Sequence, residues 1–145
     1  MKTIKFLATT TIVLILMACN GQTKSKAQTV NQQVSRIEVY DFHSTHRCMT
    51  CNAIEANTKY TLDNYFPEEL NTDKITFQVI NVDEKENEII AEKFEASGTA
   101  LILNVIKDGK ESKIDLTEFA FMNGNDQAEF SKALKAKLDT ELETL

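Results

Sequence analysis

Residues 43–51 read HSTHRCMTC and join two segments whose apolar residues follow different periods. Before this stretch, residues 37–42 are dense in β-forming side chains, which predicts a strand that is buried on both faces. After it, apolar residues recur at helical spacing from Cys51 until Pro67, the only proline of the chain. Cys48 and Cys51 therefore lie at a predicted strand-to-helix junction, where unpaired backbone N–H groups stabilise a thiolate.

The spacing of Cys48 and Cys51 allows them to close a small disulfide ring. A purely structural disulfide is one interpretation, but so short a ring constrains little of the unfolded chain's entropy. A reactive or metal-binding role is therefore favoured. Arg47 directly precedes Cys48, and its permanent positive charge is expected to stabilise the thiolate. The alternative for Arg47 is a solvated surface arginine.

Two histidines precede the cysteine pair. Together with Cys48 and Cys51, His43 and His46 place four soft or borderline ligands within nine residues. The set is compatible in type with Zn²⁺ or Cu(I), and the sulfurs alone with As(III). The spacing is not that of an established zinc module, so we predict no cofactor and keep these four residues as an alternative metal site. In the favoured interpretation His43 ends the strand, His46 tunes the thiols electrostatically, and Met49 belongs to an apolar lip around them.

Residues 1–18 are predicted to be a lipoprotein signal peptide. Two lysines precede an apolar run over residues 6–18, which is shorter than the roughly 20 residues that a membrane-spanning helix needs. The run ends in LMAC at residues 16–19, which resembles the bacterial lipobox. That resemblance implies lipidation of Cys19 and anchoring to a membrane of the cell envelope, outside the cytoplasm. The alternative is an unmodified or disulfide-bonded Cys19 behind an ordinary secretory signal.

A lipidated Cys19 would leave Cys48 and Cys51 to pair with each other, in a compartment where disulfides persist. Residues 19–35 are predicted to be a flexible tether, because after the cysteine they carry almost no large apolar side chain. Residues 36–145 have the usual length of one domain.

The charge and the glycine distribution exclude two classes of function. Loss of Lys2 and Lys5 with the signal lowers the formal net charge from −6 to −8. An acidic surface repels phosphate backbones, so a nucleic-acid partner is not expected. The four glycines are scattered, and no phosphate-binding loop is present in the sequence.

The remaining elements follow from periodicity. Residues 75–82 form a second apolar strand, and Asp83 is a plausible N-cap of a helix that extends to Phe94. Residues 101–106 and 112–119 are expected to pair as a hairpin with Asp108-Gly109 in its turn. Residues 128–142 are predicted to form an amphipathic helix along which Lys135 and Asp139 pair. The predicted order is βαβαββα, an α/β fold.

This order, with CxxC at the start of the first helix, resembles the thioredoxin fold over residues 36–142. The resemblance implies a three-layer α/β/α sandwich around a mixed central sheet. It also implies that Cys48 is the attacking cysteine, that Cys51 resolves, and that Asp41 is a buried acid accepting the proton of Cys51. Asp41 lies one residue further from the first cysteine than the family pattern. More narrowly, residues 42–51 resemble a small bacterial thioredoxin-like family labelled ArsF-like, after the nitroreductase subunit ArsF.

Two positions depart from the thioredoxin pattern. Arg47 stands where the family usually has tryptophan, and the chain contains no tryptophan. Thr99 and Ala100 are expected to line the substrate groove, where the family has a cis-proline that shapes the groove and keeps metals off the thiols. Absence of that proline weakens general oxidoreductase function and leaves room for metal binding.

The sequence thus predicts a membrane-anchored, extracytoplasmic protein that exchanges the Cys48/Cys51 disulfide with a protein partner of the cell envelope. Whether the exchange is enzymatic turnover stays open at this point. One alternative is a thiol-based binder or carrier of a soft metal or metalloid such as As(III) or Cu(I). Another is a non-catalytic accessory subunit that uses the fold for contact only.

Overall fold

The computed structural model describes residues 35–145. Its elements are β1 (Arg36–His43), α1 (Met49–Tyr65), α2 (Pro67–Asn71), β2 (Ile75–Asn81), the 3₁₀ turn η1 (Lys85–Asn87), α3 (Glu88–Lys93), β3 (Ala100–Lys107), β4 (Lys110–Asp115), α4 (Thr117–Asn123) and α5 (Gln127–Leu142). None of these helices has the length and apolar character needed to cross a bilayer. The predicted signal peptide, Cys19 and the tether up to residue 34 lie outside the described residues.

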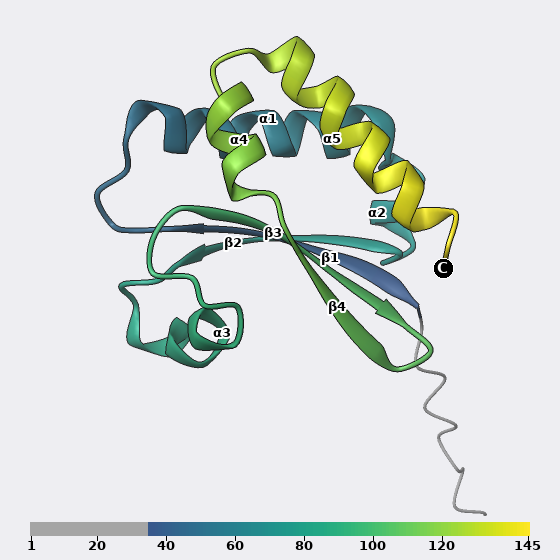
Figure 1. Cartoon of the computed structure of the whole chain (residues 1–145), viewed down its shortest axis with the longest axis horizontal. Helices are drawn as coiled ribbons and strands as arrows, with labels where there is room; N and C mark the ends of the chain where they lie inside the picture. The colour runs from purple at the N-terminus through teal and green to yellow at the C-terminus, as the bar shows by residue number, and fades with distance from the viewer. Residues whose placement is uncertain (1–34) are drawn as a thin grey trace, which may run out of the picture. The chain divides into compact units, whose positions relative to one another are not determined.

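The four strands form one mixed sheet in the order β2-β1-β3-β4. β1 pairs with β2 in parallel and with β3 antiparallel, and β4 pairs antiparallel with β3. Helices α1, α4 and α5 cover one face of the sheet and α3 lies against the other (Figure 1). This arrangement is the three-layer, thioredoxin-like α/β/α fold that the sequence predicted.

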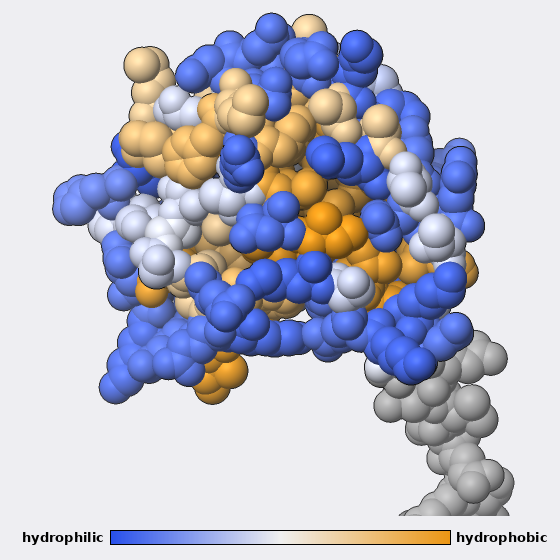
Figure 2. Space-filling view, in the orientation of Figure 1, coloured by the Kyte–Doolittle hydropathy of each residue, from blue (hydrophilic) through white to orange (hydrophobic). Residues whose placement is uncertain are grey.

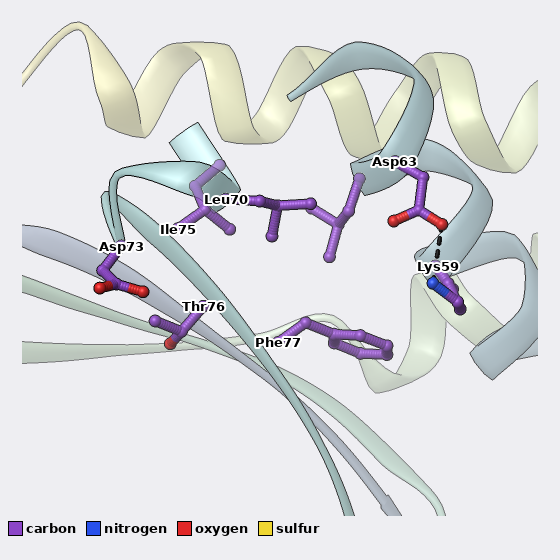
Figure 3. A pocket seen from close by; sticks show the side chains of 8 residues that line it. Lys59, Asp63, Leu70, Asp73, Ile75, Thr76 and Phe77 are labelled. Carbon is purple, nitrogen blue, oxygen red and sulfur yellow. Dashed lines mark hydrogen bonds and ion pairs between the residues drawn. The ribbon is translucent and has the colours of Figure 1, made fainter. Parts of the chain in front are cut away.

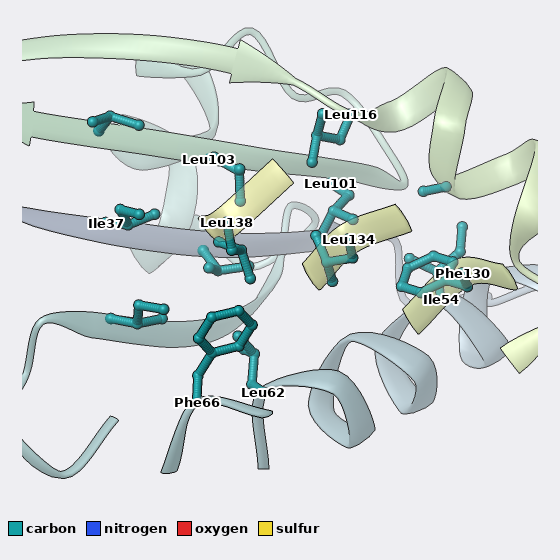
Figure 4. Packing of buried hydrophobic residues seen from close by; sticks show 14 residues of the cluster. Ile37, Ile54, Leu62, Phe66, Leu101, Leu103, Leu116, Phe130, Leu134 and Leu138 are labelled. Atoms are coloured by element: carbon teal, nitrogen blue, oxygen red, sulfur yellow. The ribbon is translucent and has the colours of Figure 1, made fainter. Parts of the chain in front are cut away.

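The central strand β1 is buried on both faces, as its composition predicted. Ile37 and Val39 point into the larger core between the sheet and the helices α1 and α5, several of whose members are labelled in Figure 4. Tyr40 and Phe42 alternate to the opposite face, where they pack with Phe94 at the end of α3. By the same alternation, Asp41 faces the α1 layer.

Several local predictions are confirmed. The hairpin between β3 and β4 turns at Asp108 and Gly109, both with positive φ (48° and 78°), as a type I′ turn requires. Lys135 Nζ lies 2.6 Å from Asp139 Oδ2 on α5. The first helix begins two residues earlier than expected, at Met49, and Cys48 is its N-cap.

Other local predictions are wrong. The second strand of the hairpin ends at Asp115, and residues 117–119, expected to belong to the strand, form the start of α4 instead. The first helix does end just before Pro67, at Tyr65, but Pro67 also stands in the first turn of a second helix, α2, that was not predicted. The expected helix after Asp83 is divided into η1 and α3, and Asp83 caps neither. The element order therefore contains two helices, α2 and α4, beyond the predicted βαβαββα.

Candidate functional site

Cys48 and Cys51 form a disulfide at the N-terminus of α1, with a Cα–Cα distance of 5.0 Å. Cys48 has an extended backbone, with φ −76° and ψ 166°, and caps the helix through its sulfur, which accepts from the Cys51 backbone N–H at 3.0 Å. Cys48 is exposed, whereas Cys51 is 7% exposed. The two sulfurs are thus unequally accessible. A thiol or disulfide of another molecule would reach the sulfur of Cys48 first.

The same geometry favours a Cys48 thiolate once the disulfide is reduced. The Cys51 N–H that donates to the neutral sulfur would donate more strongly to an anion. The positive end of the α1 dipole adds to this effect. The first turn of α1 contains no acidic residue that would oppose a negative charge there.

Asp41 lies beneath this end of α1, fully buried on β1. Neither of its carboxylate oxygens has a hydrogen-bond partner among the described residues. Burial raises the pKa of Asp41 to about 7; the Arg47 charge opposes this rise and the Glu55 charge adds to it. A carboxyl with this pKa exchanges its proton near neutrality, which fits the proton acceptor that the resemblance implies.

Arg47 points into the fold rather than along the surface. Its side chain is 18% exposed, with Nη2 3.6 Å from Asp41 Oδ2 and Nη1 paired with Glu55 Oε2. Nη2 also donates to the Cys51 carbonyl oxygen at 3.2 Å. The alternative of a solvated surface arginine is therefore wrong. The hydrogen bond and ion pairs of the guanidinium link β1 and α1 beneath the disulfide and do not involve the Cys48 sulfur.

Glu55 was not identified from the sequence. It follows Cys51 by four residues and therefore lies one turn further along the same face of α1. That spacing was a usable signal, because an acid in this place faces the buried strand that carries Asp41. The structure brings Asp41, Arg47 and Glu55 together as one cation between two carboxylates.

The two histidines take the places that the favoured interpretation gave them. His43 ends β1, with Nδ1 2.9 Å from the Ser44 carbonyl oxygen, and His46 is exposed in the following loop. Across residues 35–145, no three His, Cys, Asp or Glu side chains are placed so that they could hold a metal ion. The alternative four-ligand site of His43, His46, Cys48 and Cys51 is therefore not assembled in this disulfide-bonded structure.

Residues 98–100 lie next to the loop that leads to Cys48. A Cβ atom added to Gly98 would be 3.7 Å from Ser44 Oγ, and Ala100 pairs with Phe42 in the sheet. Thr99 and Ala100 are partly buried, and all peptide bonds of the described chain are trans. The segment thus lies near the loop that leads to Cys48, and Ala100 packs against the cluster of Tyr40 and Phe42 on the face of the sheet opposite α1.

The loop after α4 contacts α1 directly behind the disulfide. Asn57 Nδ2 donates to the Gly124 carbonyl oxygen at 2.8 Å, and Asn125 Nδ2 donates to Thr50 Oγ1 at 3.3 Å. This contact was not predicted, because α4 itself was not predicted. It places α4 beside the first turns of α1 (Figure 1).

Two hollows of the surface lie elsewhere. One of about 350 Å³ separates α1 and α2 from the start of β2 (Figure 3) and is lined by Lys59, Leu62, Asp63, Leu70, Asp73, Ile75, Thr76 and Phe77. The other, about 400 Å³, lies at the β3–β4 hairpin and the end of α5. Neither is lined by a residue of the disulfide site.

No family model matches the chain, and no curated protein matches it either. Among solved structures, a thioredoxin from Thermus thermophilus is 21% identical and aligns with 71% of this chain and 74% of its own, with a TM-score of 0.46. Fasciola hepatica thioredoxin is 24% identical over 61% of this chain and 76% of its own, with a TM-score of 0.39. A malarial protein is 18% identical over 61% and 94%, also with a TM-score of 0.39.

By their own strand order and helix placement, the described residues form a thioredoxin-like domain with a CxxC disulfide at the start of its first helix. Strand order, helix placement and the position of the cysteines define this class. The narrower resemblance to the ArsF-like family stays a prediction, as does the lipid anchor.

Proposed function

We propose that this chain is a membrane-anchored, extracytoplasmic thiol–disulfide exchange protein that reacts through Cys48 and Cys51. The observation that carries the proposal is the inequality of the two cysteines. Cys48 is exposed at a helix N-terminus, Cys51 is buried one turn behind it, and the two are already bonded. A disulfide held in this way has one sulfur for the partner and one for resolution.

In the reducing direction, the Cys48 thiolate attacks one sulfur of a partner disulfide. A Cys48–partner bond forms, and the other partner sulfur leaves with the electron pair as a thiolate. The Cys51 thiol then loses its proton, to Asp41 or to a water, and its thiolate attacks Cys48 Sγ. The Cys48–Cys51 bond closes, the second partner sulfur leaves as a thiolate, and two electrons have passed from this chain to the partner.

Asp41 and Arg47 support the resolving step in this mechanism. With a pKa of about 7, Asp41 is partly ionised at neutral pH and can take up a proton in the buried layer behind Cys51. Arg47 donates to the carbonyl oxygen of Cys51, and its positive charge lies 3.6 Å from the carboxylate of Asp41 without a hydrogen bond to it. Thr99 and Ala100 are proposed to contact the partner segment at the disulfide.

The exchange is tested with dithiol-reduced protein and glutathione disulfide. We expect oxidation of the protein and release of glutathione, and we expect Cys51→Ser to accumulate a mixed disulfide at Cys48 because it cannot resolve. Cys48→Ser should not react. Equal alkylation rates of the two thiols in the reduced protein, or a mixed disulfide that forms at Cys51, would contradict these roles.

The membrane anchor is a separate part of the proposal and rests on the sequence LMAC at residues 16–19. Cys19→Ser should abolish fatty-acid labelling and move the protein into the soluble fraction. Membrane association that survives this change would remove the anchor from the proposal while leaving the exchange chemistry intact.

The carrier of As(III) or Cu(I) is the competing function, with the reduced thiols as ligands and no turnover. Its sequence argument is the missing proline, so Ala100→Pro is the informative variant. A carrier should bind one soft ion per reduced chain, and the variant should bind it more weakly. Absence of binding in the parent chain would leave thiol exchange as the better account of the two cysteines.

A further inference from the structure

Three large apolar side chains are exposed around the outer end of α1. They are Met49 at 85% exposed, next to Cys48, and Phe121 and Met122 of α4 at 43% and 76%. We call these three residues the apolar rim. In Figure 2, orange and pale orange side chains gather over the region where Figure 1 shows α4 and the start of α1.

Packing in the core does not explain why the exposed residues of α4, Phe121 and Met122, are apolar. Ala120 is buried and Phe119 packs against Phe130, so these two residues attach the helix to the domain. Phe121 and Met122 follow them on the outer side. Methionine and aromatic side chains that stay exposed together adapt well to apolar surfaces of different shape.

The position of α4 beside α1 is fixed by close contact. A Cβ atom on Gly124 would lie 2.8 Å from the Ala120 carbonyl oxygen and 3.1 Å from Ile54 Cγ1, so only glycine allows this approach. The bonds from Asn57 to Gly124 and from Asn125 to Thr50 hold the loop in place. The rim is therefore a fixed feature next to the disulfide and not a mobile flap.

A second feature near the disulfide is acidic. Residues 83–88 read DEKENE and contain four carboxylates and one lysine, and none of these carboxylates forms an ion pair with another described residue. Asp83 Oδ2 accepts from the Thr45 backbone N–H at 2.7 Å, which fixes this acidic loop to the loop that leads to Cys48. The nearest arginine, Arg47, is already paired with Asp41 and Glu55.

The surface around Cys48 thus has two different parts. The apolar rim lies on the α4 side, and the carboxylates of the acidic loop, which form no ion pair, lie on the other side. A partner that forms a mixed disulfide with Cys48 must bring its own cysteine into this space. Complementary charge would steer a basic segment to the acidic loop, and burial would favour an apolar side chain against the rim.

We propose that this surface recognises a cysteine-bearing protein segment with an apolar residue beside its cysteine and basic residues on the other side. This inference rests on the proposed exchange function and deepens it, because it names the partner class of the same site. Met49, Phe121 and Met122 bind the apolar residue, and the acidic loop binds the basic residues.

The experiment uses short cysteine peptides, each joined to thionitrobenzoate as a mixed disulfide, and full-length protein previously reduced with a dithiol. Cys48 attacks the peptide sulfur because thionitrobenzoate is the better leaving group, and its coloured thiolate is released. One peptide has leucine before and two lysines after its cysteine. In the others, serine replaces leucine or glutamate replaces lysine, and the glutathione–thionitrobenzoate disulfide is the small reference.

We expect the leucine–lysine peptide to react about tenfold faster than the serine and glutamate peptides, the size expected for one buried side chain and a few steering charges. Met122→Gln should reduce the leucine preference about threefold. Tyr65→Gln is the control, since Tyr65 is 46% exposed and lies at the opposite end of α1 from the disulfide. Glu84→Gln and added salt should each weaken the lysine preference.

The outcomes separate the two proposals. No release of thionitrobenzoate, even from the glutathione reference, would overturn the exchange function and this inference with it. Release from the reference and equal rates for all peptides would overturn the recognition surface alone. Equal effects of Met122→Gln and Tyr65→Gln on the leucine preference would also overturn it, because α4 would then have no particular role.

Discussion

Asp41 and its two neighbours are the residues that distinguish the layer beneath the disulfide. One guanidinium lies between two carboxylates, and Glu55 holds the closer pairing with it. Arg47 therefore compensates Asp41 only in part, and burial dominates the pKa of that carboxyl. The residue that replaces the usual tryptophan before the first cysteine thus acts inward, on the acid of the mechanism.

The raised pKa of Asp41 predicts how stability depends on pH. An unfolded aspartate has a pKa of about 3.9, and the folded one about 7. Between these values the folded protein holds a proton that the unfolded chain has lost, so its stability falls as the pH rises through this window. Asp41→Asn should remove that fall, and its stability relative to the parent should increase by about 2–4 kcal/mol across the window.

Denaturant unfolding of both oxidised proteins at a series of pH values measures this difference. The comparison cancels the titration of the other carboxylates, which the two proteins share. Parallel stability curves across the window would mean that Asp41 is ionised in the folded protein, and would remove it as a proton acceptor near neutrality.

Arg47 is expected to control the same titration. Arg47→Met removes the cation beside Asp41 and leaves the Glu55 charge, so the pKa of Asp41 should rise further, by about one unit. The carboxyl carbon shift of Asp41 in an NMR titration measures it directly. Lys59→Met is the control, because it removes the same charge from the exposed Lys59–Asp63 pair on the same helix.

An unchanged Asp41 titration in Arg47→Met would show that the guanidinium only holds the backbone of Cys51. Arg47→Lys keeps the charge but cannot reach both carboxylates with a planar fork. It should therefore give an intermediate titration if the charge matters.

Among the elements, α4 was not predicted from the sequence, and it packs against β3, α1 and α5. Gly124 ends the helix at the point where its backbone touches Ala120 and Ile54. We expect Gly124→Ala to lower the free energy of unfolding by about 1–3 kcal/mol, because the added methyl group forces the loop away from α1.

Gly98→Ala is the matched control for this prediction. Its added Cβ would meet only Ser44 Oγ, at an ordinary 3.7 Å, so the stability should stay close to that of the parent. Equal unfolding midpoints for the two variants would mean that the α4 loop moves away from α1 without cost. The rim next to the disulfide would then not be fixed.

Periodicity predicted correctly those elements whose apolar residues follow a single clear spacing. β1 and β2 are apolar runs, α1 and α5 repeat at helical spacing, and the Asp108-Gly109 pair marks the hairpin. Residues 112–116 read SKIDL, in which Ile114 and Leu116 alternate with polar residues as in a strand, and the predicted strand was extended along this pattern to Phe119. Ala120 is buried in the core and Phe119 packs against it, and these contacts stabilise the helix instead.

The candidate site, like the fold, could be predicted from the sequence only in part. The strand-to-helix junction of Cys48 and Cys51 follows from the pattern of residues 37–66, and the resemblance identified Asp41. The direction of the Arg47 side chain and its pairing with Glu55 depend on how α1 lies over β1, and a linear sequence does not give that geometry. Asp83 shows the same limit, since its carboxylate caps the Thr45 loop and no helix.

At the scale of the whole molecule, the fold and the disulfide are largely independent. The larger core consists mainly of strand residues and the inner faces of α1 and α5 (Figure 4). The disulfide is not part of this cluster and lies at the N-terminus of α1. An exchange protein needs this separation, because it must stay folded in both redox states. A structural disulfide, in contrast, would be expected to hold a domain that is marginal without it.

Reduction of the Cys48–Cys51 bond should therefore leave the domain folded. A ring of this size removes little entropy from the unfolded chain, about 2 kcal/mol by loop-closure estimates, against the 5–15 kcal/mol that stabilises a typical domain. Denaturant unfolding with and without a dithiol, and of the Cys48→Ser/Cys51→Ser variant, measures this difference. We expect cooperative unfolding of all three with a loss of no more than about 2 kcal/mol. A reduced protein without native structure in buffer would make the disulfide a structural one, and would end the case for exchange at Cys48.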